Sequence, residues 1–270
     1  KEGSIDLCGK DIVAASEKEM QSIRGQLVSM IFQDPMTCMN PTMKVGKQLT
    51  ETLVKKKKIA KADAEKEAIR LLKLVQIPNP EERAKQYPHE FSGGMRQRAM
   101  IAMALACNPQ LLIADEPTTA LDVTIQAQIM QLMAKIKEET KTAIILITHD
   151  LGVVANLADE VSVMYAGKIV ERGSVRDIFY NPGHPYTVAL LRSLPTIDTK
   201  KDEELISIPG TPPDLYAPPQ GCGFASRCEH CMKICKANQP PVFELGEGHT
   251  ASCWRLHPDF PGAKEGKVNG

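Results

Sequence analysis

Residues 111–117 read LLIADEP, a short apolar run that ends in two acidic side chains and a proline. An apolar run bounded by polar residues is typical of a buried strand, here one that stops at Asp115. A carboxylate at a strand end can hold Mg²⁺ through its water shell, since Mg²⁺ takes few protein ligands. The next carboxylate, on Glu116, would point elsewhere and could accept a proton from an attacking water. An ordinary acidic turn would carry the same residues.

Further strands and helices are predicted on both sides of this run. The segments 27–32 (LVSMIF) and 143–148 (AIILIT) read as strands, and 123–139 has apolar side chains along one helical face. The pattern from about residue 45 to 106 is helical. Alternation of this kind predicts an α/β fold whose parallel sheet binds its ligand at the carboxyl ends of the strands.

Two polar residues follow the flanking strands. Gln33 comes after the first, and its amide could contact both a metal ion and an attacking water. His149 follows the AIILIT strand, which we expect to lie beside the Asp115 strand, and could hydrogen-bond a terminal phosphate. A lone histidine is more often structural, but this position favours a role at the ligand edge.

A possible phosphate contact lies at residues 91–98, FSGGMRQR. Ser92 is a good helix N-cap, and Gly93 and Gly94 let the backbone approach a ligand closely. The free N–H groups of a helix start favour phosphate. A simple capped turn looks the same, so the position about 20 residues before Asp115 gives the motif its weight.

Composition excludes some classes of function. The 270 residues carry 33 basic and 33 acidic side chains, without the basic surplus of a nucleic-acid binder. No apolar stretch approaches the roughly 18 residues of a membrane span, and no secretory signal opens the chain. We therefore expect a soluble chain that reaches a membrane only through partners.

The eight cysteines are unevenly distributed. Five of them lie close together after a proline-rich segment at 195–220: Cys222, Cys228, Cys231, Cys235 and Cys253. In a cytosolic protein, such a cluster indicates metal binding more than disulfides. Zn²⁺ and an iron–sulfur cluster both suit thiolates, and spacing does not decide between them. Reduced, unligated thiols remain the alternative.

Five motifs in order resemble the nucleotide-binding subunits of ABC transporters: IFQDP, FSGGM, LLIADEP, TALD at 119–122 and ITHD at 147–150. The resemblance implies a P-loop NTPase-like ABC ATPase core at 1–194 with a helical subdomain at about 36–107, and a cysteine-rich extension at 195–270. FSGGM stands where many members have LSGGQ, which leaves the backbone donors intact. The implied roles are Gln33 in the Q-loop, Ser92, Gly93, Gly94 and Met95 in the signature motif, Asp115 and Glu116 as the Walker B pair, Asp122 in the D-loop and His149 as the switch histidine.

A finer resemblance, to the oligopeptide and dipeptide importer ATPases and their nickel-importer relatives, rests on YAGKIVERG at 165–173, NPGHPYT at 181–187 and the late cysteines. It implies ATP and Mg²⁺ as cofactors and a peripheral position on the cytoplasmic face of the cell membrane. The implied partners are a second, homologous ATPase subunit, two transmembrane permease subunits and an extracytoplasmic substrate-binding protein. It also implies a [4Fe–4S] cluster on Cys222, Cys228, Cys235 and Cys253, with Cys231 spare.

One family motif is missing. No G-x-x-x-x-G-K-[ST] string, whose N–H groups and lysine cradle phosphates, occurs in the sequence. The expectation is an ABC ATPase truncated at its N-terminus and inactive on its own. A catalytically silent regulatory or assembly subunit is the alternative. A DNA-repair-type ABC ATPase is disfavoured, since the coiled-coil heptads it needs are absent.

Overall fold

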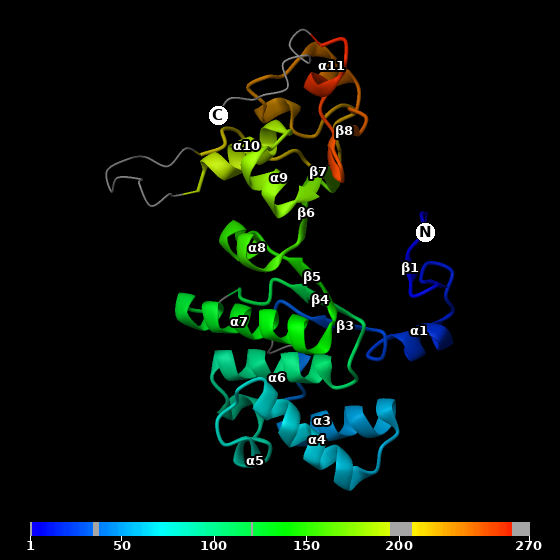
Figure 1. The fold of residues 1–270 in the computed structure, drawn as a ribbon, viewed down its shortest axis with the longest axis vertical. Coiled ribbons are helices and arrows are strands. Elements are labelled where there is room, and N and C mark those ends of the chain that lie inside the picture. Colours follow the sequence, from blue (N-terminus) through cyan, green and yellow to red (C-terminus); the bar gives the residue numbers. More distant parts are fainter. Residues whose placement is uncertain (1, 35–37, 120, 195–206, 261–270) are drawn as a thin grey trace. The chain divides into compact units, whose positions relative to one another are not determined.

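The computed structural model describes residues 2–34, 38–119, 121–194 and 207–260 (Figure 1). Ala120 of the TALD motif and the first part of the predicted linker, 195–206, lie outside the described residues. The chain forms two compact units, Lys1–Val153 and Val154–Gly270.

The first unit contains the predicted parallel sheet. Its three strands run in the order β3-β4-β5, with bounds β3 Val28–Ile31, β4 Leu111–Asp115 and β5 Ala143–Ile147. Both neighbouring pairs are parallel, with Ile31 opposite Ala114 and Asp115 opposite Ile147. This confirms the prediction that the strand ending at Asp115 lies beside the strand that precedes His149. The carboxyl ends of all three strands meet at one edge.

Helices cover one face of this sheet. Leu112, Ala114 and Ile31 are fully buried there, and helix α6 (Gly93–Leu105) packs against β3. Helix α7 (Val123–Thr140) buries an apolar stripe of Ile129, Leu132, Met133 and Ile136. This spacing is that of one face of a helix, as the sequence predicted.

The opposite face of the sheet is apolar and exposed. Met30 is 37% exposed, Ile145 49% and Ile147 47%. Met30 and Ile145 lie in one row across the sheet, on either side of Ile113. Parallel sheets are normally covered on both faces, so the described part of this unit leaves one side of its sheet without a cover.

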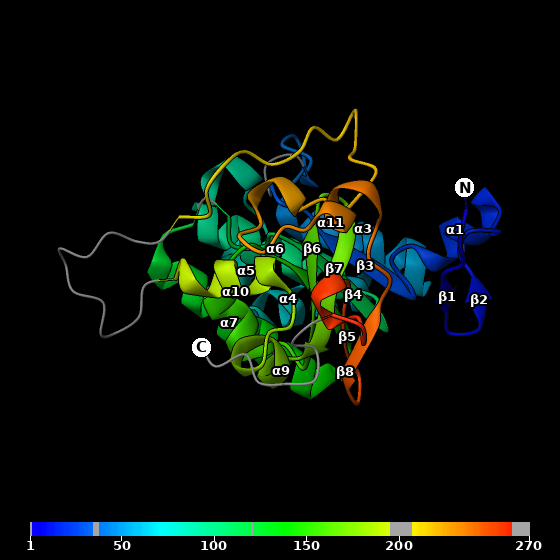
Figure 2. The ribbon, with the colours of Figure 1, turned by 90° about the horizontal axis from the view of Figure 1, so that it is seen from above.

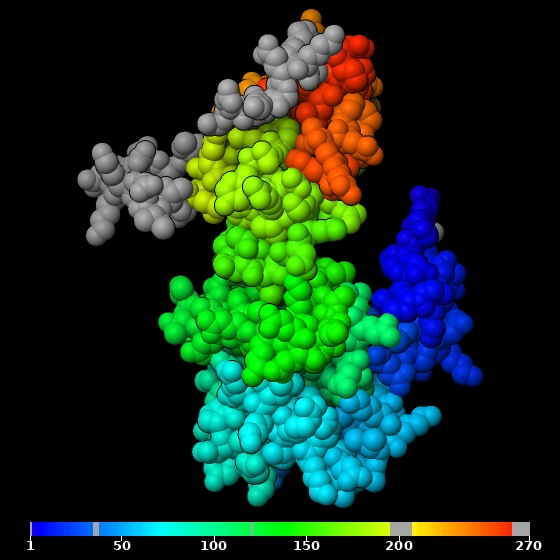
Figure 3. All heavy atoms as spheres, in the orientation of Figure 1, coloured from blue at the N-terminus to red at the C-terminus, as the bar shows by residue number. Residues whose placement is uncertain are grey.

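The helical part of the first unit precedes α6 in the chain. It comprises α3 (Val45–Thr52), a π-helical turn (Leu53–Lys57), α4 (Lys61–Leu74) and α5 (Pro80–Arg83). Four leucines in this region are buried, Leu49, Leu53, Leu71 and Leu72, and α3, α4 and α6 contact one another. The helices form one packed block, coloured cyan in Figure 3. The existence of this helical region is confirmed. Its limits at about 36 and 107 stay a prediction, and residue 36 lies outside the described residues.

The hairpin at the start of the first unit has the turn its sequence indicates. Cys8 and Gly9 (φ 55° and 76°) join β1 (Asp6–Leu7) to β2 (Lys10–Asp11). Two-residue turns with both φ values positive match the twist of the flanking strands and favour Gly at the second position. Helix α1 (Glu17–Ile23) follows, begun by a capping box between Ser16 and Glu19.

The second unit is built on an antiparallel sheet in the order β6-β7-β9-β8. Strands β6, β7 and β8 are labelled in Figure 2. The strands are β6 Glu160–Tyr165, β7 Lys168–Ser174, β8 Phe243–Gly246 and β9 His249–Ala251. The helices are α8 Leu151–Leu157, which spans the junction of the two units, α9 Val175–Tyr180, α10 Pro185–Arg192 and α11 Lys233–Ala237. The core gathers Val163, Tyr165, Val170, Ile178 and Phe224.

The boundary between the compact units differs from the expected one at 194. Strand β9, from the cysteine-rich region, pairs with β7, so residues 154–194 and that region share one sheet. The functional division into an ATPase domain at 1–194 and an extension at 195–270 stays a prediction. No helix in the described ranges is long and apolar enough to cross a membrane.

The exposed sheet face can be tested by a pair of substitutions. We expect Leu112→Ala, on the covered face, to lower the free energy of unfolding by about 2–5 kcal/mol through lost burial and a cavity. Ile145→Thr, on the open face, keeps a β-branched side chain and should cost less than about 1 kcal/mol. Chemical denaturation of both variants measures this, and equal losses would show that the Ile145 face is covered.

Candidate functional site

The edge where the parallel strands end brings together Gln33, Glu116 and His149. Glu116 Oε2 accepts a hydrogen bond of 2.8 Å from Gln33 Nε2, and Glu116 Oε1 lies 3.2 Å from His149 Nδ1. Each residue follows a different strand, in the order of the sheet. The strand register therefore explains why residues 33, 116 and 149 meet.

Glu116 has an unusual backbone conformation. Its φ is +44°, in the left-handed region that costs a non-glycine residue energy and that clusters at functional sites. Its N–H donates to Ile147 O at 2.9 Å, which anchors the turn to the neighbouring strand. The turn takes Glu116 out of the extended backbone of β4, which ends at Asp115.

Thr119 completes this cluster. Its hydroxyl Oγ1 lies 2.8 Å from Glu116 Oε2. The sequence analysis placed Thr119 in the TALD motif but gave it no role, and that motif was the only signal. Three donors thus converge on one carboxylate.

The hydrogen bonds from Thr119 first, and then from His149 and Gln33, hold the pKa of Glu116 below its ordinary value. Glu116 is therefore an ionised acceptor at neutral pH. The His149 side chain is 77% exposed, so the surrounding chain leaves room for the ring to leave the carboxylate and reach a ligand.

The two aspartates of the predicted site lie on different elements. Asp115 is the last residue of β4 and is half-buried. Asp122 is the N-cap of α7, where its Oδ1 accepts a 2.9 Å hydrogen bond from Ile125 N. The cap gives Asp122 a structural role, while the predicted ligand roles of both residues stay predictions.

The FSGGM motif begins helix α6, as predicted. Ser92 is the N-cap, and its hydroxyl accepts a hydrogen bond from Met95 N at 3.3 Å. The two glycines differ in their surroundings. A Cβ on Gly94 would lie 2.8 Å from Cγ2 of Ile125, whereas one on Gly93 would meet nothing closer than Leu121 Cδ2 at 3.8 Å. Packing inside the chain therefore requires a glycine at 94 but not at 93.

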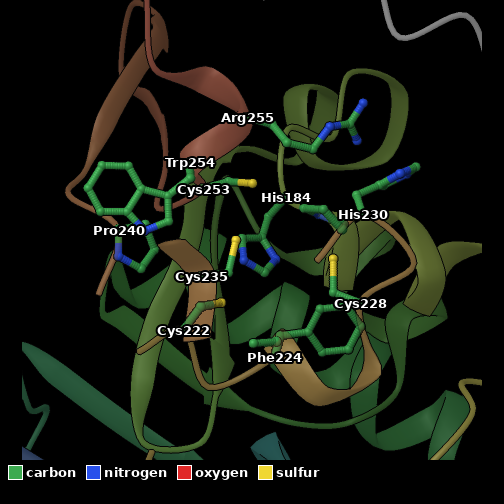
Figure 4. A pocket seen from close by; sticks show the side chains of 12 residues that line it. His184, Cys222, Phe224, Cys228, His230, Cys235, Pro240, Cys253, Trp254 and Arg255 are labelled. Carbon is green, nitrogen blue, oxygen red and sulfur yellow. The ribbon is translucent and has the colours of Figure 1, made fainter. Parts of the chain in front are cut away.

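A second candidate site is a small cavity of about 20 Å³ in the second unit (Figure 4). Four cysteines line it, and they are the four that the resemblance selected: Cys222, Cys228, Cys235 and Cys253. Cys231 does not line it. Burial raises the pKa of the thiols of Cys222 and Cys228, and that of Cys253 to about 11. An isolated thiol here would stay protonated, and only a bound cation would make thiolates favourable.

In the part of the chain that the structure describes, no group of three or more His, Cys, Asp or Glu side chains is arranged so that it could hold a metal ion. A single Zn²⁺ would need each sulfur within about 2.3 Å of it. The four thiols are soft donors of the kind that bind Zn²⁺ or an iron–sulfur cluster.

Comparison with known proteins gives the chain its family. A model described as "ABC transporter" matches residues 1–119, and one described as "Oligopeptide/dipeptide transporter, C-terminal region" matches 170–235. The oligopeptide transport ATP-binding protein OppD of Bacillus subtilis is 62% identical over 97% of this chain and 73% of its own length. The chain belongs to this family of ABC transporter ATP-binding proteins.

Other members agree. The dipeptide transport ATP-binding protein DppD of Bacillus subtilis is 57% identical over 94% of this chain and 75% of its own length. A solved dimer of the ATP-binding cassette MJ0796, bound to ADP and Pi, is 27% identical with a TM-score of 0.59, over 65% of this chain and 74% of that one. The predicted ABC ATPase fold is confirmed.

The difference between the two signature glycines predicts opposite effects on stability. Gly94→Ala should destabilise the first unit, because overpacking against Ile125 costs about 1–3 kcal/mol and exceeds the helix-propensity gain of up to about 1 kcal/mol. Gly93→Ala should be neutral or stabilising, since its Cβ meets only open space and ordinary contacts. Urea denaturation of both variants measures this. Equal destabilisation would contradict the packing argument.

Proposed function

We propose that this chain is the ATP-binding and ATP-hydrolysing subunit that energises the import of dipeptides or oligopeptides through a membrane ABC transporter. The single observation that carries the catalytic assignment is the convergence of Gln33 and His149 on Glu116 at the carboxyl edge of the sheet. The printed names of the relatives, oligopeptide and dipeptide transport ATP-binding proteins, support a peptide cargo. A nickel chelate is the alternative cargo.

Glu116 is proposed as the general base. An ionised carboxylate can take a proton from a water as the water oxygen attacks the γ-phosphorus, while the bond from that phosphorus to the ADP oxygen breaks. The products are ADP and inorganic phosphate. His149 and Gln33 would first release the carboxylate, so that His149 donates to the γ-phosphate and Gln33 orients the water.

Asp115 is the proposed carboxylate for Mg²⁺, which would offset the negative charge of the phosphates when bound. Its place at the end of the central strand fits that donor role. The 270 residues contain no G-x-x-x-x-G-K-[ST] string. We therefore propose that they supply the catalytic residues of the site, and we assign no phosphate-cradling loop to them.

The signature residues are proposed to act on a second, homologous subunit. Gly93 is open to its surroundings, so what favours a glycine there is the approach of a ligand from outside the chain. Ser92, Gly93, Gly94 and Met95 would offer α6 N–H groups to the nucleotide of the partner, with Asp122 at the same junction. Two permease subunits and a substrate-binding protein would complete the importer, with this chain peripheral on the cytoplasmic face of the membrane.

The catalytic assignment is tested with Glu116→Gln in the assembled transporter. The amide keeps the shape of the side chain but cannot take a proton, so we expect ATP turnover to fall about 10²–10⁴-fold while ATP binding persists. Glu138→Gln, the same change at an exposed position near the end of α7, is the matched control and should keep full turnover. Near-normal hydrolysis by Glu116→Gln would remove Glu116 as the base.

We further propose that the cysteine cavity holds a [4Fe–4S] cluster through Cys222, Cys228, Cys235 and Cys253. Two observations support this: the four thiols share one cavity, and their burial makes free thiolates unfavourable. The segment from 207 to 242 has little regular structure, so ligand bonds would supply the stabilisation that packing does not.

Single serine substitutions test the cluster. Anaerobically purified protein should be brown and contain iron and sulfide, and serine at any of the four positions should reduce the iron content. Cys231→Ser is the matched control, and it should keep the iron because Cys231 does not line the cavity. Stoichiometric zinc in a colourless preparation would move the assignment to zinc. A preparation without metal would end the metal hypothesis.

A further inference from the structure

A buried histidine also lines the cysteine cavity. His184, from the NPGHPYT motif, is 1% exposed and contributes to the cavity wall beside the cysteines (Figure 4). It is also the N-cap of helix α10. A capping side chain need not face a cavity, and the motif has no function in the ATP site, so the ring calls for a separate explanation.

The hydrogen bonds of the ring fix its tautomer. Nδ1 accepts a hydrogen bond of 3.1 Å from the backbone N–H of Tyr186. A nitrogen that accepts cannot carry a proton, so the ring is neutral and its proton is on Nε2. Within the described ranges, no hydrogen-bond partner for Nε2 is found. The ring therefore has one unused donor, at a buried position on a thiol-lined cavity.

A buried carboxylate holds the backbone of this histidine in place. Glu171, whose side chain is fully buried, accepts hydrogen bonds from Gly183 N at 2.6 Å and His184 N at 3.0 Å. The same carboxylate lies 2.9 Å from Nε2 of His249 in β9, the strand that leads to Cys253. One side chain thus fixes both the histidine and the approach to a cavity cysteine. Such supporting hydrogen bonds are typical around a side chain that must keep one orientation toward a bound group.

We propose that His184 is a positioning residue whose Nε2–H donates a hydrogen bond to a sulfur of the group held in the cavity. The proposal rests on the cluster proposed above. In the proposed cluster the four thiols would be the complete ligand set, so His184 acts as a donor and not as a ligand. A hydrogen bond to a cluster sulfur stabilises the reduced, more negative state and raises the reduction potential. The potential serves here as a measure of the hydrogen bond, and no electron transfer in transport is implied.

Two substitutions at this position separate capping from donation. In His184→Asn the short amide can still accept the Tyr186 N–H, as a good N-cap does, but does not reach the position of Nε2. In His184→Gln the longer amide places an N–H donor near that position but does not suit the cap. His184→Asn therefore keeps the cap and loses the donor, whereas His184→Gln keeps the donor and loses the cap.

The test is the reduction potential of the anaerobic holoprotein, together with its iron content and stability. We expect His184→Asn to keep its iron and its stability but to lower the reduction equilibrium constant on the order of tenfold, which is about 59 mV for a one-electron couple. His184→Gln should keep a potential near that of the wild type while losing stability. Equal potentials in all three proteins, or loss of iron from His184→Asn, would overturn the proposal.

A second measurement does not depend on iron. In the cluster-free protein, ¹⁵N NMR of the imidazole should show the Nε2–H tautomer for His184, and the opposite tautomer would overturn the inference directly. If wild-type protein contains no iron, the cluster proposal fails, and the donor role fails with it. If it contains iron but the Asn variant has an unchanged potential, only the role of His184 is refuted.

Discussion

The meeting of three parallel strands at one edge is the constraint on which the catalytic site depends. Parallel register places the residues after β3, β4 and β5 side by side, and the hydrogen bond from Glu116 N to Ile147 O holds the turn between two of them. Any slip of β4 by one residue would turn the buried Leu112 and Ala114 outward and move Glu116 away from its partners. The packing of α6 against the sheet therefore also protects the geometry of the site.

The second unit uses a different means of positioning. Its cysteines come from loops and short elements, so strand register alone cannot place them. The buried carboxylate of Glu171, in β7, binds both the loop at 183–184 and strand β9. Phe224 packs edge-on against Tyr165, with the two ring centroids 5.3 Å apart. A fully buried carboxylate is stable only when donors surround it, which makes this network sensitive to the loss of any one partner.

Much of the first unit could be predicted from the sequence, because its signals are local. LLIADEP and AIILITHD each contain an apolar strand and the polar residue that follows it, and parallel strands leave little freedom in where those residues meet. Thr119 could not be assigned in this way, since its contact with Glu116 depends on a left-handed turn that no local pattern specifies. The pairing of β7 with β9 could not be predicted either. Strand β9, His249–Ala251, has three residues, too few to show the alternation from which a strand is predicted. Residue spacing indicated a metal-binding cluster, but singling out four of five cysteines required the family resemblance.

The central claim is that Glu116 exchanges its partners within the chain for a water and a nucleotide. The most direct measurement is a high-resolution structure of the assembled transporter carrying Glu116→Gln and trapped with ATP and Mg²⁺. The account predicts an ordered water between the side chain at 116 and the γ-phosphate, with His149 turned from that side chain to the phosphate. A nucleotide-bound structure in which His149 still contacts residue 116, with no water beside it, would contradict the account.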